Sequence, residues 1–382
     1  MITVFTEKQR VPIYCWADRL DRLSLQSLQK LARWDGLAGP IAVMPDVHPA
    51  GELCVGVVLA TTDCVLPTAI GDDLGCGIAS KCYEFDALSL SKAHLETMVD
   101  ELMLRIPLGL QTHKREQPLT RELEMRPLST PGLEHQKIWK GRRHIGTLGG
   151  GNHFVELQKD AQGRLWVAVH SGSRGTGAAI AQHYSNAARA AGKRAPLPCL
   201  ELGSKLGTAL LNDFNWAFNF AVENRCRIIE EVEIVLTRLN GSEVRSSRYF
   251  DVAHNLITNE SHLGKDLVVH RKGAMPASRG VTGLIPGSMG TASYLVEGLG
   301  HETSYCSSSH GAGRRMTRTE ARNHISIDSL RRQMKGVVFP RNVTNLVEEA
   351  PEVYKDIKQV LSQQSELVRP ILRLEPIAVI KG

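Results

Sequence analysis

The sequence lacks any continuous apolar stretch long enough to cross a bilayer. A membrane-spanning helix needs about 18 to 20 such residues. The opening residues, MITVFTEKQRVPIYCW, also lack the basic-then-apolar order that marks a secretion signal. A cytoplasmic protein with no membrane partner is therefore the expectation.

Two motif classes are missing as well. The eight cysteines show no CxxC spacing and no compact disulfide framework, so all except Cys76 are expected to be reduced and buried. No GxxxxGK[ST] segment occurs, which excludes a P-loop as the holder of any nucleotide. Tandem repeats, low-complexity tracts and clear linkers are also absent. We therefore expect one composite domain spanning residues 1–382.

Short apolar runs that end in glycine-rich loops dominate the chain and predict strands, as in RLWVAVHSGSRG and DLVVHRKG. Helical patterns cover about residues 91–106, 206–236 and 351–367. The polar stretch 112–143 is typical of an exposed excursion. These patterns predict an α+β fold with central β-sheets, flanking helices and an active site in glycine-rich loops. The net charge of +6 permits an anionic partner without identifying one.

Five side chains in glycine- or asparagine-marked contexts could bind metal. They are Asp73, Cys76, His153, His170 and His254. A thiolate, a carboxylate and imidazoles suit borderline divalent metals, and five donors exceed the need of one tetrahedral ion with an open position. A two-metal centre bridged by the Cys76 sulfur is the resulting hypothesis.

Three loops favour phosphate binding. They are SGSRG with Arg174, PGSMG with Ser288, and SSSHGAGRR with His310 and Arg314. Flexible glycines let the backbone approach an anion, and arginine pairs with phosphate. His310 lies among small residues and not among apolar neighbours, so we interpret it as a nucleophile beside phosphate. Arg174 and Arg314 are the candidates for contact with a phosphate of the substrate.

An ordered series of motifs extends over nearly the whole chain: DLGCG, GTLGGGNHFVE, VHSGSRG, HN, RKGA, IPGSMG, SHGAGR, YKDI and a terminal VIKG. In this order they resemble the RtcB family of GTP-dependent RNA ligases, as a compact branch of it. The resemblance implies that His310 attacks the α-phosphate of GTP and becomes guanylylated. The guanylyl group would then activate an RNA 3′-phosphate, itself obtained from a 2′,3′-cyclic phosphate where needed, for attack by a 5′-hydroxyl.

The resemblance also implies two manganese ions, one held by Asp73, Cys76 and His153, the other by Cys76, His170 and His254. By donor chemistry alone the same residues would bind zinc more tightly. The nucleotide contacts that it implies are Asn152, His153, Phe154, Val155, Glu156, His254, Asn255, Pro286, Gly287, Ser288, Met289, Ser293, His310, Gly311, Ala312, Gly313, Tyr354 and Lys381. Among them, Glu156 would accept from guanine N1 and N2, which adenine cannot offer, while Lys381 would donate to the polar edge of the base.

Alternatives remain open at this point. The RNA joined could belong to tRNA splicing or to repair of cleaved RNA, and departures from the family pattern at Asp72, Ala253 and Ser308 favour repair. A two-metal phosphodiesterase or phosphatase would use the same ligands but would not need His310 or a guanine-reading Glu156. A non-catalytic RNA-binding relative would be expected to lack a ligand or the nucleophile. A helper protein is a further partner that the sequence leaves open.

Overall fold

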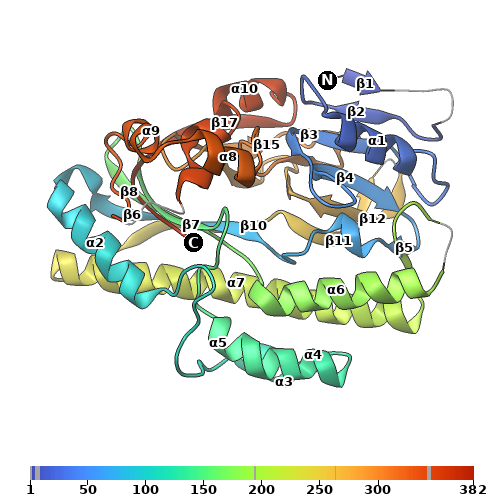
Figure 1. Ribbon diagram of the computed structural model, residues 1–382, viewed down its shortest axis with the longest axis horizontal. Coiled ribbons are helices and arrows are strands. Elements are labelled where there is room, and N and C mark those ends of the chain that lie inside the picture. The colour runs from blue at the N-terminus through green and yellow to red at the C-terminus, as the bar shows by residue number, and fades with distance from the viewer. Residues whose placement is uncertain (1, 5–8, 193–194, 263, 342–345) are drawn as a thin grey trace.

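Two mainly antiparallel β-sheets form the centre of the protein in a computed structural model, which describes residues 2–4, 9–192, 195–262, 264–341 and 346–382 (Figure 1). The six-stranded sheet has the order β1 (Ile2–Val4), β2 (Ile13–Cys15), β3 (Ile41–His48), β4 (Val55–Thr61), β12 (Lys265–Lys272) and β11 (Asn255–His262). The seven-stranded sheet has the order β10 (Ser246–Ala253), β6 (Gly77–Asp86), β8 (Arg164–Ser171), β7 (Phe154–Lys159), β17 (Val368–Lys381), β15 (Ser293–Gly298) and β14 (Thr282–Ile285). Short pairs join β13 (Ala274–Pro276) to β16 (Ser307–Ser309) and β5 (Cys64–Val65) to β9 (Leu200–Glu201).

Helices cover the sheets on both sides. They are α1 (Arg22–Leu31), α2 (Lys92–Arg105), α3 (Arg121–Met125), α4 (Pro131–Gln136), α5 (Arg142–His144), α6 (Arg174–Ala190), α7 (Lys205–Asn240), α8 (Arg318–His324), α9 (Ile327–Gln333) and α10 (Ile357–Gln363). In Figure 1, α6 and α7 run beneath the sheets, while α8, α9 and α10 lie above them. This arrangement confirms the α+β prediction and the strands expected in it.

Two of the three predicted helices are confirmed. The first, α2, begins after Ser91, whose side chain accepts from the His94 backbone amide, and it ends before Pro107. The longest, α7, has 36 residues and buries aromatic side chains such as Trp216 and Phe220. It packs against β6, β8, α2 and α6, which explains its apolar residues on most faces. In the part of the chain that the structure describes, no helix is apolar enough over sufficient length to span a membrane.

The predicted helix over 351–367 is wrong in its extent. A 3₁₀ turn covers Pro351–Val353, Tyr354 is extended, and only Ile357–Gln363 form the α-helix α10. Asp356 caps α10 by accepting from the Lys358 amide. Tyr354 instead forms a bridge with Arg314, a contact between distant segments that overrides the local helical pattern.

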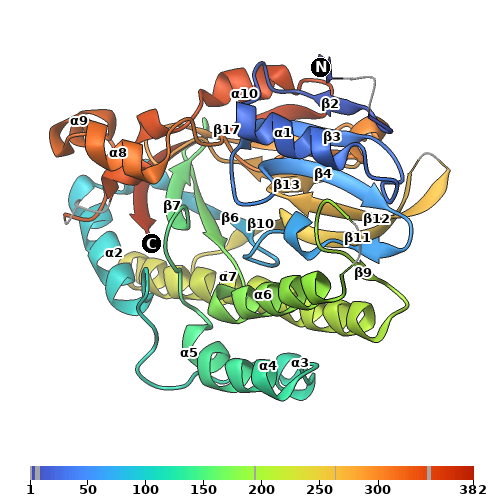
Figure 2. The ribbon, with the colours of Figure 1, turned by 45° about the vertical axis from the view of Figure 1, so that its right-hand side comes forward.

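The stretch 112–143 protrudes on the far side of α6 and α7, as a comparison of Figures 1 and 2 shows. It contains α3, α4, a π-helical turn (Lys137–Gly141) and α5. Its apolar side chains Leu123, Leu128 and Leu133 are buried against α6 and α7, while Trp139 remains 60% exposed. The excursion is therefore anchored by an apolar face and displays a mainly polar surface.

Candidate active site

The predicted metal ligands converge where the two sheets meet. His254 lies between β10 of the seven-stranded sheet and β11 of the six-stranded sheet. Asp73 and Cys76 precede β6, and His153 precedes β7. His170 on β8 is paired with Phe154 on β7, and this pairing places His170 beside these loops. Side chains from distant parts of the sequence, from Asp73 to His254, therefore lie together in one cluster of metal-type donors.

One group of donors combines Asp73, Cys76 and His153. The Nε2 atom of His153 lies 3.1 Å from Oδ2 of Asp73 and 3.4 Å from Sγ of Cys76. Ligands placed tetrahedrally at about 2.1 Å from an ion are about 3.4 Å apart. These spacings therefore fit a divalent cation.

A second group shares the same sulfur. Sγ of Cys76 lies 3.3 Å from Nε2 of His170, which in turn lies 3.3 Å from Nε2 of His254. The donor atoms of these three residues are buried and mutually close. The residues therefore fit two cations with Cys76 between them, as the sequence predicted from donor chemistry.

Residues behind the ligands fix their orientation. Nδ1 of His153 contacts the carbonyl oxygen of Leu148 at 2.9 Å, which leaves Nε2 facing the other donors. The backbone amide of Ser173 donates to Asp73 at 2.9 Å. The fully buried Arg225 donates to the carbonyls of Gly75 and Ser171 at 2.9 Å, so it ties the loop before β6 to the end of β8.

The protonation states at this cluster follow from burial. Burial holds the pKa values of His170 and His254 well below their usual range, so both imidazoles are neutral and able to bind metal. Burial, with the Asp73 carboxylate, raises the pKa of the Cys76 thiol well above its ordinary value. A nearby divalent cation would supply the positive charge that a Cys76 thiolate needs.

His310 lies at the edge of the same cluster. Its ring centroid is 4.6 Å from that of His254. Its Nδ1 atom lies 2.7 Å from Oδ2 of the buried Asp46, which also accepts from the His310 backbone amide at 3.1 Å. Lys355 donates to the carbonyls on either side of Asp46, at Pro45 and Val47. With Nδ1 directed at a carboxylate, Nε2 is the nitrogen left for reaction.

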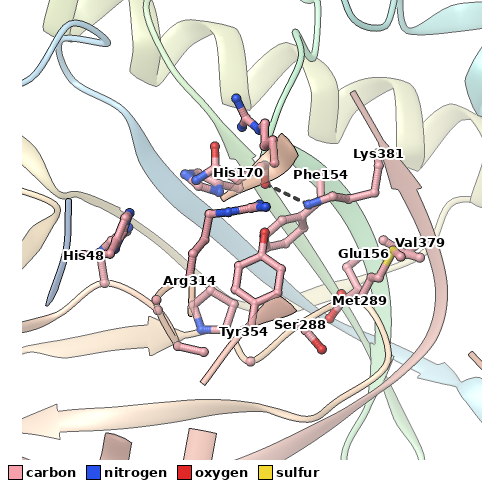
Figure 3. Close-up of a pocket in the computed structure, with 18 residues that line it drawn as sticks. His48, Phe154, Glu156, His170, Ser288, Met289, Arg314, Tyr354, Val379 and Lys381 are labelled. Carbon is pink, nitrogen blue, oxygen red and sulfur yellow. Dashed lines mark hydrogen bonds between the residues drawn. The ribbon is translucent and has the colours of Figure 1, made fainter. Parts of the chain in front are cut away.

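A pocket lined by 18 residues opens beside His310 (Figure 3). Glu156 of β7 and Lys381 of β17 approach it from adjacent strands, with Tyr354 across from them. Burial raises the pKa of Glu156 to about 7, although Gln158 and Lys381 act to lower it. The lining residues that the sequence predicted are Asn152, Phe154, Glu156, Pro286, Gly287, Ser288, Met289, His310, Gly311, Ala312, Gly313, Tyr354 and Lys381.

The other predicted nucleotide contacts lie elsewhere. Val155 points to the opposite face of β7 and packs in the core with α2 and α7. Ser293 is buried and accepts from Gln158. His153, His254 and Asn255 line a separate pocket together with Asp73 and Cys76, which we call the cation hollow. The Asn255 side chain donates to the Asp73 carbonyl and accepts from the Gly273 amide. Alternation along a strand is the reason that Val155 and Glu156 face opposite ways.

The two predicted RNA-phosphate residues occupy different surroundings. Nη1 of Arg174 lies 3.3 Å from Nδ1 of His153, so Arg174 borders the cation hollow. Arg314 donates through all three guanidinium nitrogens to the protein, to Met316, Glu348 and Glu349. Arg314 therefore forms a wall of the pocket beside His310, and its contact with RNA stays a prediction.

The sequence reasoning missed several residues of the site. Asp46 and His48 carry no site prediction from the sequence, although an aspartate and a histidine close together in MPDVHPAG are a usable signal. Burial lowers the pKa of His48 to about 4, which makes it a neutral group lining the pocket. Glu349 lies 3.2 Å from Nζ of Lys381 and also holds Arg314. No local pattern marks Glu349.

An α+β protein with two groups of metal-type donors that share one thiol, next to a histidine and a pocket, is the class that this geometry defines. The family model described as tRNA-splicing ligase RtcB matches residues 27–135 and 124–382, so the chain belongs to the RtcB family. It is 33% identical to RNA-splicing ligase RtcB of Escherichia coli K12, with 98% of each chain covered. It is 29% identical to RNA-splicing ligase RtcB of Mycobacterium tuberculosis, covering 92% of this chain and 99% of the relative. RNA-splicing ligase RtcB2 of Escherichia coli ATCC 25922 is also 29% identical, with 95% and 93% covered.

Proposed function

We propose that the protein is an RNA ligase that joins 3′-phosphate or 2′,3′-cyclic phosphate ends to 5′-hydroxyl ends, with GTP and two manganese ions. One observation carries the proposal. The pocket beside His310, which we propose to bind the nucleotide and call the nucleotide pocket, shares His48, Asn152 and His310 with the cation hollow. A nucleophile placed between a base-binding pocket and a cation pair can reach the phosphates of a nucleotide that occupies both.

In the first step, Nε2 of His310 attacks the α-phosphorus of GTP, and the bond to pyrophosphate breaks. The negative charge of Asp46 beside Nδ1 stabilises the positive charge that develops on the ring. The guanylyl group then passes to an RNA 3′-phosphate to give an RNA-3′-pp-5′-G end. Attack by a 5′-hydroxyl forms the new phosphodiester and releases GMP. Bound divalent cations would offset the charge of the phosphates in these steps.

Guanine selection rests on Glu156 and Lys381. A carboxylate accepts the two hydrogens that guanine N1 and N2 offer, whereas adenine presents an acceptor at N1. Lys381 donates to the Asn152 carbonyl at 3.1 Å and lies 5.5 Å from the centre of the Phe154 ring, so its ammonium is held at the pocket floor. This support favours GTP over ATP as the nucleotide.

The remaining partners are proposals of the same kind. The RNA would come from tRNA splicing or from repair of cleaved RNA in the cytoplasm, and a helper protein could renew the guanylylated enzyme. Residues 1–382 would act as one RtcB-like domain. Manganese is proposed from the resemblance to the family. The donors themselves would bind zinc more tightly, so the availability of each metal in the cell must decide which one is bound.

Incubation with α-labelled GTP and manganese, followed by denaturing electrophoresis and an acid wash, tests the proposal. We expect an acid-labile label on the wild type and on His135→Ala, which removes an exposed histidine of the excursion. His310→Ala should carry no label while its metal content is unchanged. Absence of label from folded, metal-loaded wild type would contradict the proposal, and a labelled His310→Ala would assign the nucleophile elsewhere.

A further inference from the structure

A second group of metal-type donors lies at the far end of β11. It consists of His262, Glu302 and Cys306, whose donor atoms all lie within 4.8 Å of one another. His262 is the last residue of β11, eight residues beyond His254. A strand rises by about 3.4 Å per residue, which places the two histidines roughly 25 Å apart. The group is therefore separate from the catalytic cluster.

The tautomer of His262 is set by its neighbours. Its Nε2 atom lies 2.6 Å from Oε2 of Glu260. The Glu260 carboxylate also forms an ion pair with the Arg271 guanidinium. Arg271 donates to this carboxylate at 2.9 Å. Nε2 of His262 therefore carries the hydrogen, as in carboxylate–histidine–metal triads.

The other nitrogen of His262 makes no hydrogen bond. The residue is only 5% exposed. Nδ1 lies 3.5 Å from Oε2 of Glu302. A cation between Nδ1 and this carboxylate would satisfy both groups.

The backbone at Cys306 has an uncommon conformation, at the end of the 3₁₀ turn Glu302–Ser304. Tyr305 and Cys306 have φ of 52° and 47°, a left-handed conformation that non-glycine residues rarely adopt, here in two successive residues. Arg271 donates to the Tyr305 carbonyl at 2.8 Å, so the residue that fixes Glu260 also holds this turn. Strain of this kind persists where the surroundings impose it, often at binding sites.

We propose that Nδ1 of His262, the Glu302 carboxylate and Sγ of Cys306 bind one divalent cation of the zinc class. Nitrogen, oxygen and sulfur donors together are the ligands of zinc, and Glu302, with its side chain 60% exposed, leaves the fourth position open to water. Burial and Glu302 raise the pKa of the Cys306 thiol, so cation binding would release its proton to solvent.

Cation binding at this second site would also stabilise the conformation of the active site. Cys306 directly precedes β16, whose last residue, Ser309, is followed by His310. A cation held by His262, Glu302 and Cys306 would pin the end of β11 to the segment that carries the nucleophile. Binding to the folded chain alone should raise its melting temperature, and the stabilisation should grow with the logarithm of cation concentration once this exceeds Kd.

Cobalt(II) can report on the site, because a thiolate ligand gives it a near-ultraviolet charge-transfer band. The full chain with Cys76→Ser would serve as background, since it lacks the sulfur of the catalytic cluster. We expect about one thiolate-bound cobalt per chain in this background, displaced by zinc. Adding Cys306→Ser should abolish the band. Adding Cys226→Ser, a change at a more accessible thiol, should leave it unchanged.

Glu302→Gln is the second variant, because its partly solvent-exposed side chain makes loss of folding an unsuitable explanation for a change in binding. Zinc affinity of this variant, measured against a chromophoric chelator in the Cys76→Ser background, should fall at least about tenfold. Retention of the cobalt band without Cys306, or unchanged zinc affinity in Glu302→Gln, would overturn the proposal. No GTP or RNA is present, so the result is independent of the ligase proposal.

Discussion

Replacing Glu156 by glutamine tests how this buried carboxylate of the nucleotide pocket affects both the stability of the folded protein and its binding of GTP. Glu156 is 3% exposed, and burial raises its pKa from 4.5 to about 7. A carboxyl group whose pKa is raised by folding favours the folded state below its unfolded pKa, and this contribution is lost as pH rises through the folded pKa. The difference between the two pKa values corresponds to about 3 kcal/mol of unfolding free energy at pH values above both.

Glutamine is close to glutamate in size and stays neutral, so it avoids the cost of burying the charge. Glu156→Gln should therefore exceed the wild type in unfolding free energy by up to about 3 kcal/mol near pH 9, with the advantage shrinking to zero below about pH 4.5. Urea unfolding of nucleotide-free protein across this range measures the difference. Glu84→Gln, at an exposed carboxylate of β6, is the matched control and should show no such trend.

The same substitution should weaken GTP binding, because an amide cannot accept from guanine with a full negative charge. GTP affinity of the wild type should rise as pH increases through about 7, since the ionised form of Glu156 is the one that accepts from the base. Isothermal titration calorimetry at several pH values would measure both effects. A wild-type and Glu156→Gln difference in stability that does not change with pH would refute the reasoning.

Three other substitutions probe the supports of the site. Arg225→Leu should cost about 3 to 5 kcal/mol in urea unfolding, because it leaves Asp251, its partner at 2.7 Å, unpaired in a buried place; a loss below about 1 kcal/mol would contradict this. Gly313→Ala should reduce guanylylation by at least about tenfold with metal content unchanged. The reason is that φ of Gly313 is 74° and a β-carbon there would lie 2.2 Å from the Asp46 carbonyl oxygen. Labelling at the wild-type level would show that the loop adapts. Cys76→Ser should lower the occupancy of both cations in metal analysis after dialysis, and loss of one cation alone would argue against a shared sulfur.

The sequence predicted most where chemistry depends on local pattern. The apolar periodicity of α2 and α7 survives in the structure because these helices bury the residues that the pattern marks. Cysteine and histidines next to glycine-rich loops were identified as a cation cluster because few residue types bind such ions. The structure brings these residues within 3.1 to 3.4 Å of one another.

The nearby polar partners could not be predicted in the same way. Asp46 contacts His310 across 264 positions of sequence, and Glu349 reaches Lys381 only because β17 returns to the centre of its sheet. The side of β7 that Glu156 faces depends on which strands flank it.

The amino-acid sequence by itself thus determined the family and the donor types, and it predicted the nucleophile, because these depend on residue identity in short segments. Only the tertiary structure decided which carboxylate orients His310, which arginine is held within the pocket wall, and that His262, Glu302 and Cys306 meet at a second site. Such contacts arise from strand order and long-range packing, which no local periodicity encodes.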